Sequence, residues 1–182
     1  RNEKGEKASF PVSENVHIHH ILHSSTAPAP ISKNIAEHAH TLAEQLADTL
    51  EVVGLLAVEF FLTQDDQLIV NEMAPRPHNS GHYTIDACHT SQFQQHIRAI
   101  TGLPLGKTDT HTPAVMINIL GDLWSKTSPP WNLLFKNPST QLHLYDKGEA
   151  RKGRKMGHYT VLDQNLSLAK KEAEALFLEL KD

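Results

Sequence analysis

The stretch that decides the fold runs from Leu55 to Met73 and reads LLAVEFFL (55–62), TQDDQ (63–67) and LIVNEM (68–73). Two apolar runs of strand length are joined by a short polar segment, which predicts an antiparallel β-hairpin. On its N-terminal side, Ser32 is a good N-cap for a helix over residues 33–50. On its C-terminal side, a second helix is expected over residues 84–100. The sequence therefore predicts a mixed α and β chain of the α+β class, built on antiparallel hairpins.

Two glutamates, Glu59 and Glu72, lie inside these apolar runs. A four-residue turn pairs Thr63 with Leu68, and that register places Glu59 directly opposite Glu72 on one face. Opposed like charges destabilise a sheet, so a cation is expected between them. Mg²⁺ fits, because it takes carboxylate oxygens and shares its remaining positions with water and phosphates. Asn71 adds a neutral oxygen if the strand bulges. The alternative is that one glutamate simply faces solvent on a half-exposed sheet.

The loop that follows the second run carries four polar side chains before a glycine, in APRPHNSGH (74–82). Its prolines stiffen the backbone by fixing φ. Arg76 offers a planar fork for a carboxylate, bicarbonate or phosphate, and His78 can move a proton near neutral pH. Asn79 and Ser80 can donate hydrogen bonds to an oxyanion. We therefore expect an anion site. The alternative is a surface turn in which Ser80 or Thr84 caps a helix.

A basic turn, DKGEARKGRK, occupies residues 146–155 and includes Lys147 and Arg154. Its two glycines let the backbone approach a ligand closely. A nucleic-acid surface is disfavoured, because the turn has no aromatic residue and the chain has a formal net charge of -4. The two remaining interpretations are a grip on one phosphate of a small molecule and an ordinary solvated turn.

The polar segment over residues 107–113 indicates a boundary, and it divides the chain into units 1–106 and 107–182. A single cysteine, Cys88, excludes an internal disulfide and fits the reducing cytoplasm. The sequence contains no run of the ~20 apolar residues that span a bilayer, so no membrane partner is expected. We expect a cytoplasmic protein.

Histidines crowd one segment near the N-terminus, at His17, His19, His20 and His23. Strand alternation puts His17, His19 and His23 on one face and His20 on the other. Matched cysteine or carboxylate spacing is missing, so a zinc site is disfavoured. We interpret them as polar strand residues, one of which reaches a nucleotide.

Taken together, the motifs VNEMAPRPHNSGH (70–82), YDK (145–147) and GRKMGH (153–158) closely resemble the signature of the 5-(carboxyamino)imidazole ribonucleotide synthases. The segments FP (10–11), ENVH (14–17) and QF (92–93) fit the same family, so the resemblance covers nearly the whole chain. It implies an ATP-grasp fold. The chain would form the C-terminal lobe of that fold, followed by a small C-terminal β-rich domain.

The resemblance implies an activity: carboxylation of 5-aminoimidazole ribonucleotide with bicarbonate, driven by ATP through carboxyphosphate, with Mg²⁺ and in a homodimer. The implied metal ligands are Glu59 and Glu72. The implied nucleotide contacts are His17, Asn71 and Glu72. The implied bicarbonate and substrate loop consists of Arg76, His78, Asn79 and Ser80. The residues implied to bind the 5′-phosphate of the ribonucleotide are Lys147 and Arg154.

Two other functions are weighed against this one. A different ATP-grasp ligase of purine synthesis, such as the formate-dependent glycinamide ribonucleotide transformylase, is disfavoured by the run from His78 to His82. A non-catalytic interaction module is disfavoured because a decayed site should lose costly residues, and this chain contains Glu59, Glu72, Arg76 and Lys147. The family's glycine-rich phosphate lid and ATP-binding lysines belong to an N-terminal half that these residues do not include. We therefore expect half of an active site.

Overall fold

The computed structural model describes residues 1–124 and 128–181. Contacts divide the chain into two compact units. The N-terminal unit comprises Arg1–Ser13 and Pro28–His111, and the C-terminal unit comprises Glu14–Ala27 and the residues from Thr112 onward. This division differs from the expected one between residues 106 and 107. The reason is that residues 14–27 form strands of the C-terminal sheet, and pairing between strands far apart in the sequence leaves no local pattern.

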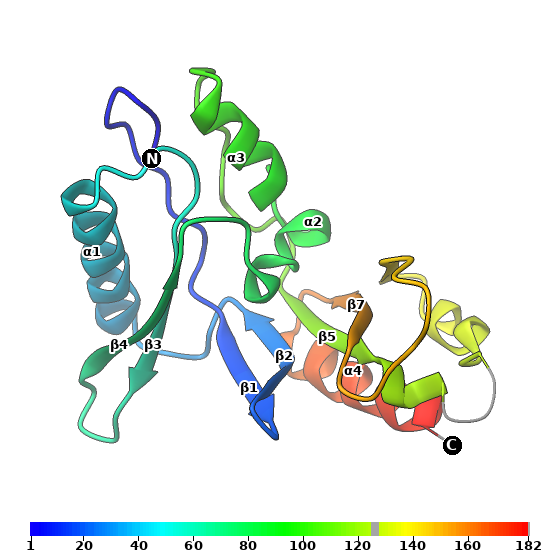
Figure 1. Cartoon of the computed structure of the whole chain (residues 1–182). Coiled ribbons are helices and arrows are strands. Elements are labelled where there is room, and N and C mark those ends of the chain that lie inside the picture. Colours follow the sequence, from blue (N-terminus) through cyan, green and yellow to red (C-terminus); the bar gives the residue numbers. More distant parts are fainter. Residues whose placement is uncertain (125–127, 182) are drawn as a thin grey trace. The chain divides into compact units, whose positions relative to one another are not determined.

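The N-terminal unit is built on the expected hairpin of β3 (Ala57–Leu62) and β4 (Leu68–Ala74), which pair antiparallel. Helix α1 (Lys33–Thr49) lies beside this hairpin (Figure 1). It begins where the sequence predicts, because the Ser32 hydroxyl accepts a hydrogen bond from the Ile35 amide at 3.3 Å. The hairpin leads into a short 3₁₀ turn, η1 (Asn79–Gly81).

The single helix predicted over residues 84–100 is wrong, because the structure has two helices there. Helix α2 spans Thr84–Ala87 and α3 spans Gln92–Ile100. Between them Cys88 is extended and forms a β-bridge with Thr110. Ser91 then starts the second helix with a capping box that includes Gln94. The apolar spacing indicated helix on both sides of the break but carried no signal for the bridge.

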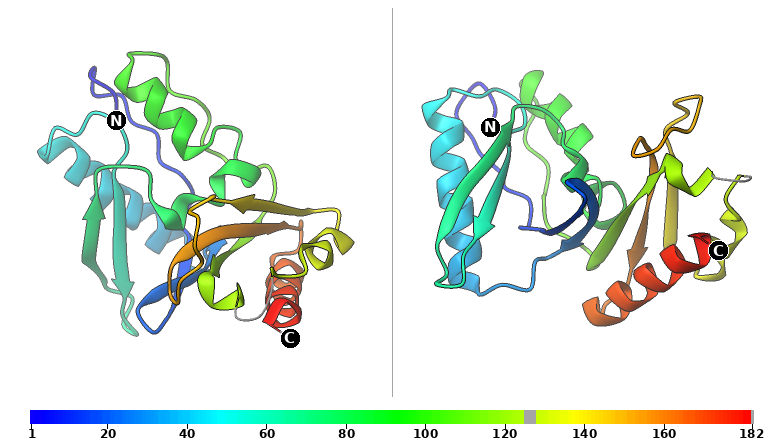
Figure 2. Two further views of the ribbon diagram at one scale, coloured as in Figure 1. Left: turned by 45° about the vertical axis from the view of Figure 1, so that its right-hand side comes forward. Right: turned by 60° about the horizontal axis from the view of Figure 1, so that its bottom comes forward.

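The C-terminal unit contains a five-stranded antiparallel sheet in the order β1-β2-β5-β7-β6. Its strands are β1 (Glu14–Ile18), β2 (Ile21–Ala27), β5 (Ala114–Leu120), β6 (Thr140–Leu144) and β7 (Lys155–Leu162). Two 3₁₀ helices, η2 (Gly121–Trp124) and η3 (Trp131–Lys136), lie between β5 and β6 in the sequence. Helix α4 (Leu166–Lys181) lies along one face of the sheet (Figure 2). The mixed α and β architecture with antiparallel sheets is confirmed.

The core of the C-terminal unit lies between α4 and the sheet. Ile117 and Ile119 on β5 and Tyr159 on β7 are fully buried there against Ala173 and Leu176 of α4. Burying an aliphatic side chain of this size contributes about 1.5–3 kcal/mol. The Tyr159 hydroxyl also donates a 2.7 Å hydrogen bond to the Ala173 carbonyl, which ties the helix to the strand. Among the described residues, no helix is long and apolar enough to cross a membrane.

The turn between β1 and β2 consists of His19 and His20. Both residues have positive φ, 49° and 64°. Two-residue hairpin turns require this left-handed backbone and usually place Asn-Gly there. The expectation that these two histidines lie on opposite strand faces is therefore wrong, because they form the turn itself.

Candidate functional site

The two glutamates of the hairpin are paired as predicted: Glu59 of β3 stands opposite Glu72 of β4. The route to this register differs from the expected one. Leu68 pairs with Leu62 rather than with Thr63, so the register at the turn is shifted by one residue, and a β-bulge after Glu59 restores the predicted pair. The extra residue of the bulge is Asn71, which falls between the paired positions. The bulge that the sequence left open is thus present, and bulges commonly re-aim a side chain next to a functional site.

The two carboxylates differ in their surroundings. The Glu59 side chain is only 15% exposed, whereas Glu72 is exposed. One of the two glutamates, Glu72, therefore faces solvent. Large apolar side chains of the hairpin are exposed as well, and Phe61 reaches 59%. The hairpin thus presents one shielded carboxylate and one open carboxylate beside an exposed apolar surface.

The loop after β4 brings His78 to Glu59. The His78 Nδ1 lies 3.7 Å from Glu59 Oε1 and 2.9 Å from the Ser80 hydroxyl. The His78 side chain is 16% exposed, so this contact is largely shielded from solvent. At 3.7 Å the two groups lie beyond hydrogen-bond distance, so their attraction is electrostatic and operates when the imidazole is protonated. The structure therefore gathers one predicted metal ligand and two predicted loop residues at one place.

The other two predicted loop residues lie at its two bends. Arg76 is exposed, and its Nη1 donates a 3.1 Å hydrogen bond to the Pro77 carbonyl. Asn79 opens η1, and its carbonyl accepts the His82 amide at 3.1 Å. The Tyr83 hydroxyl anchors the end of the loop with a 2.7 Å hydrogen bond to the Pro11 carbonyl. Burial raises the pKa of this phenol well above its ordinary value, so it stays a neutral donor.

The basic turn lies between β6 and β7 in the C-terminal unit. Asp146 has a positive φ of 46°, which turns the backbone so that the Lys147 ammonium lies 5.4 Å from the centre of the Tyr145 ring. This distance is within the range of a cation–π contact. Arg154 donates from Nη1 to the Glu149 carbonyl at 3.1 Å. Both predicted phosphate-binding residues therefore have ordered supports within one turn.

Two histidines that were not predicted as site residues, His143 on β6 and His158 on β7, hold Tyr145 in place. Its hydroxyl lies 2.6 Å from Nδ1 of the buried His158, and His143 stacks on His158 with ring centroids 4.6 Å apart. Burial raises the pKa of Tyr145, which keeps the phenol protonated. The sequence contains both histidines, but only the pairing of β6 with β7 places them opposite each other.

His17, the remaining predicted nucleotide contact, is exposed on β1 opposite Leu22. It belongs to the C-terminal unit, while the glutamate pair belongs to the N-terminal unit. Its contact with a nucleotide therefore stays a prediction. The nearby His23 is shielded instead: its Nε2 lies 3.3 Å from the Glu174 carboxylate, and its ring packs edge-on against Phe177.

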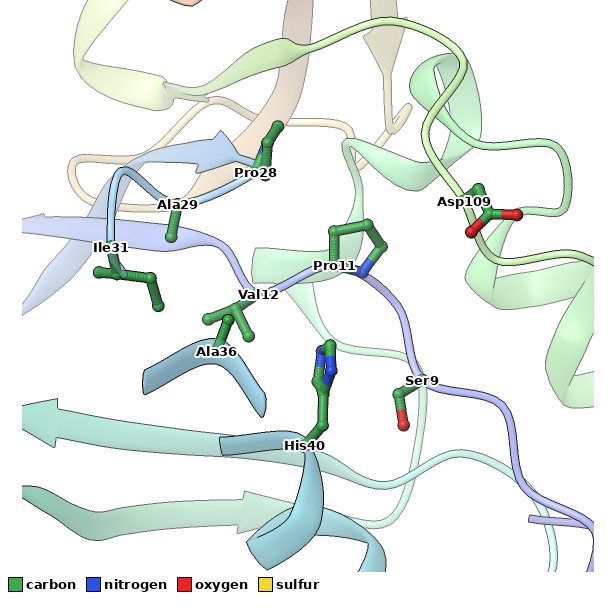
Figure 3. Close-up of a pocket in the computed structure, with 9 residues that line it drawn as sticks. All are labelled: Ser9, Pro11, Val12, Pro28, Ala29, Ile31, Ala36, His40 and Asp109. Carbon is green, nitrogen blue, oxygen red and sulfur yellow. The ribbon is translucent and has the colours of Figure 1, made fainter. Parts of the chain in front are cut away.

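The N-terminal unit also contains an open pocket of about 240 Å³ (Figure 3). Apolar walls from Pro11, Val12, Ile31 and Ala36 dominate it. His40 extends from α1 into this pocket, where its Nε2 lies 3.0 Å from the Phe10 carbonyl. The pocket is smaller than the ~300 Å³ at which ligand sites usually begin. Its walls come from residues other than the predicted site residues, so we assign it no role.

Comparisons with known proteins agree with these motifs. Residues 1–93 match the model of the ATP-grasp domain, and residues 114–172 match that of the phosphoribosylaminoimidazole carboxylase C-terminal domain. The N5-carboxyaminoimidazole ribonucleotide synthase of Bacillus subtilis (strain 168) is 53% identical over 164 residues, covering 90% of this chain and 42% of that protein.

Solved structures give the same result. The ADP complex of an N5-carboxyaminoimidazole ribonucleotide synthetase matches with a TM-score of 0.89 at 48% identity, over 98% of this chain and 46% of that one. The Aspergillus clavatus synthase in complex with ADP and 5-aminoimidazole ribonucleotide matches with a TM-score of 0.85 at 35% identity, over 94% and 46%. This chain spans less than half the length of these relatives. It belongs to the ATP-grasp family, and over nearly all of its length it is similar to the N5-carboxyaminoimidazole ribonucleotide synthases.

Proposed function

We propose that this chain supplies part of the active site of an N5-carboxyaminoimidazole ribonucleotide synthase. In that reaction the amine of 5-aminoimidazole ribonucleotide gains the carbon of bicarbonate, while ATP becomes ADP and phosphate. The observation that carries the proposal is the pairing of Glu59 with Glu72, together with His78 at 3.7 Å from Glu59. The relatives support it, because their names state this activity and solved structures contain ADP and 5-aminoimidazole ribonucleotide.

The residues of the hairpin fit a magnesium ion. Glu59 and Glu72 offer carboxylate oxygens from opposed positions, and the bulge adds the amide oxygen of Asn71 to the same end of the hairpin. Such oxygen donors are those that Mg²⁺ prefers beside phosphates. When bound, the ion supplies positive charge that offsets the charge of the phosphates. We propose that Glu59 and Glu72 hold the ion and that Asn71 and Glu72 contact the nucleotide.

The loop from Arg76 to Ser80 is proposed to bind bicarbonate and the reacting end of the ribonucleotide. Arg76 is exposed and presents a guanidinium fork, which suits a planar carboxylate. Ser80 holds the His78 ring by a 2.9 Å contact to Nδ1, which orients the ring beside Glu59. A histidine so placed can hold or release a proton near neutral pH. Asn79 is proposed to donate to the same anion.

The basic turn is proposed to bind the 5′-phosphate of the ribonucleotide. The Lys147 ammonium is a compact charge placed over the Tyr145 ring, and Arg154 is a fork steadied by the Glu149 carbonyl. A lysine and an arginine together suit a terminal phosphate, since one supplies a point charge and the other paired hydrogen bonds. His17 is proposed to contact the nucleotide.

The test measures ADP release by a full-length synthase that includes this chain. Release should require both bicarbonate and 5-aminoimidazole ribonucleotide, and mass spectrometry should find the carboxylated ribonucleotide. Glu59→Gln and Glu72→Gln should abolish turnover, whereas Glu37→Gln, an exposed site on α1, should retain it. Turnover with glycinamide ribonucleotide and formate in place of these substrates would identify a different ligase. No substrate-dependent turnover would reject the proposal.

We propose two further features of the enzyme, its oligomeric state and its location. A homodimer follows from the family resemblance, and light scattering of the full-length enzyme would test it. A cytoplasmic location follows from the single cysteine, Cys88, which is a free buried thiol.

A further inference from the structure

A buried glutamine, Gln92, holds the backbone of the loop that follows β4. Its side chain is the first of α3, and the residue is only 4% exposed. The His78 amide donates to Gln92 Oε1 at 2.9 Å, and Gln92 Nε2 donates to the His78 carbonyl at 2.8 Å. The Gln92 amide in turn donates to Thr84 Oγ1 at 3.0 Å, and that hydroxyl donates to the Gly81 carbonyl at 2.6 Å. The Gln92 side chain thus fixes the middle of the loop at His78, and the Thr84 hydroxyl fixes its end at Gly81.

This pairing determines the protonation of His82. The His78 peptide needs an acceptor at its amide and a donor at its carbonyl, so the Gln92 side chain has one possible orientation. Its Nε2 therefore has a second proton, which it donates to His82 Nδ1 at 2.8 Å. Because an amide nitrogen is a donor only, His82 Nδ1 must accept and cannot carry a proton. His82 is then a neutral imidazole with its proton on Nε2.

Glycine at position 81 is matched to this glutamine. A Cβ atom on Gly81 would lie 2.7 Å from Gln92 Oε1 and 3.1 Å from its Cδ. The end of a long side chain usually yields cheaply to such a contact. Here it cannot move without breaking its hydrogen bonds to His78 and His82. The position of the Gln92 side chain therefore depends on the absence of a side chain at Gly81.

We propose that Gln92 is a positioning residue for the anion that the loop binds: it sets the backbone of the loop at His78 and holds His82 as the neutral tautomer with its proton on Nε2. The identity of that anion as bicarbonate rests on the proposed function. The competing interpretation is that Gln92 only stabilises the start of α3. Gln95 provides the matched control, because it is equally buried on α3 and pairs in the same way with the backbone of Gly106, at 2.8 and 3.1 Å.

The first experiment observes His82 by long-range ¹H–¹⁵N spectroscopy of this chain. In the wild type, Nδ1 should lack a proton. Gln92→Glu keeps the shape of the side chain but replaces the donor with a carboxylate, so His82 Nδ1 should gain a proton. Gln95→Glu should leave the His82 spectrum unchanged. A wild-type proton on Nδ1, or no response to Gln92→Glu, would overturn the assignment.

Gly81→Ala tests the packing. It should displace the glutamine and change the His82 spectrum in the wild-type background. In the Gln92→Ala background it should change nothing further, because the obstructing atoms are gone. Equal effects in both backgrounds would show that Gly81 and Gln92 are not coupled.

The second experiment measures steady-state kinetics of the full-length synthase. Misplacing reacting groups by about 1 Å costs on the order of 100-fold, so Gln92→Glu and Gln92→Leu should lower kcat/KM for bicarbonate by about that factor. The KM for ATP should stay unchanged, and Gln95→Glu should leave all constants unchanged. Equal losses of kcat/KM for the Gln92 and Gln95 variants would show that Gln92 has only a structural role. If the wild type lacks bicarbonate-dependent turnover, the proposed function fails, and the spectra alone then decide whether Gln92 positions the loop.

Discussion

Replacing Glu72 with glutamine should stabilise the β3–β4 hairpin in buffer without divalent cations. Glu72 faces Glu59 across the two strands, and like charges in that position repel each other. Glutamine keeps the size of the side chain and its hydrogen-bonding oxygen while removing the charge. If the carboxylates serve a metal, their repulsion in its absence is the cost of that function. The change should therefore improve the stability of the hairpin while it abolishes activity.

The size of the gain follows from the geometry. Two unit charges about 4 Å apart interact by roughly 1 kcal/mol in water, and less when they are farther apart. Glu72 is exposed and so well screened, whereas Glu59 is 15% exposed, which weakens that screening. We expect a gain of about 0.3–1 kcal/mol. Glu59→Gln should gain less, because it also removes the 3.7 Å ion pair with His78.

Amide hydrogen exchange of β3 and β4 is the suitable assay, because it reports the stability of the hairpin separately from the C-terminal unit. The expected gain slows exchange about 2- to 5-fold. The difference should shrink at about 1 M salt, where the screening length falls to ~3 Å. Glu37→Gln, which removes the exposed ion pair with Lys33 on α1, should leave the hairpin unchanged. Faster exchange in Glu72→Gln, or a gain that salt does not reduce, would refute the repulsion.

Other parts of the chain give further predictions. Cys88 should resist iodoacetamide at pH 8 until the chain unfolds, because burial, helped by Asp109, raises the thiol pKa from 9.0 to about 12. The stability that this shift contributes is complete below pH 9 and is lost as the pH rises towards 12. Labelling of the native chain at the rate of the unfolded chain would contradict this prediction. Tyr145→Leu should raise the KM for the ribonucleotide about 2- to 5-fold through loss of the cation–π contact, whereas Tyr145→Phe keeps the ring; equal effects would refute that contact. His19→Asn combined with His20→Gly should raise the urea midpoint through a gain of about 1 kcal/mol, since both residues have positive φ; a lower midpoint would show that the histidines make other contacts.

The sequence by itself determined the local elements and the pairing of chemical groups. Alternating and helical apolar spacing located the β3–β4 hairpin and α1, because these signals lie within a single element. The opposition of Glu59 and Glu72 was predictable because hairpin pairing depends mainly on the turn between the strands. The prediction reached the right pair although its register at the turn was off by one residue, because the bulge at Asn71 offset that error. The roles of these residues come from the resemblance to the family and stay predictions.

Tertiary structure alone decided the features that depend on distant segments. Strand β2 pairs with β5, so residues 14–27 belong to the C-terminal unit, although no local pattern shows it. The bridge of Cys88 with Thr110 divides a segment whose spacing indicated one helix. The hydrogen bonds of Gln92 with the His78 backbone likewise join residues from separate elements. The physical reason is common to all three: a hydrogen bond between remote segments places no periodic constraint on either sequence, so it becomes visible only when the chain has folded.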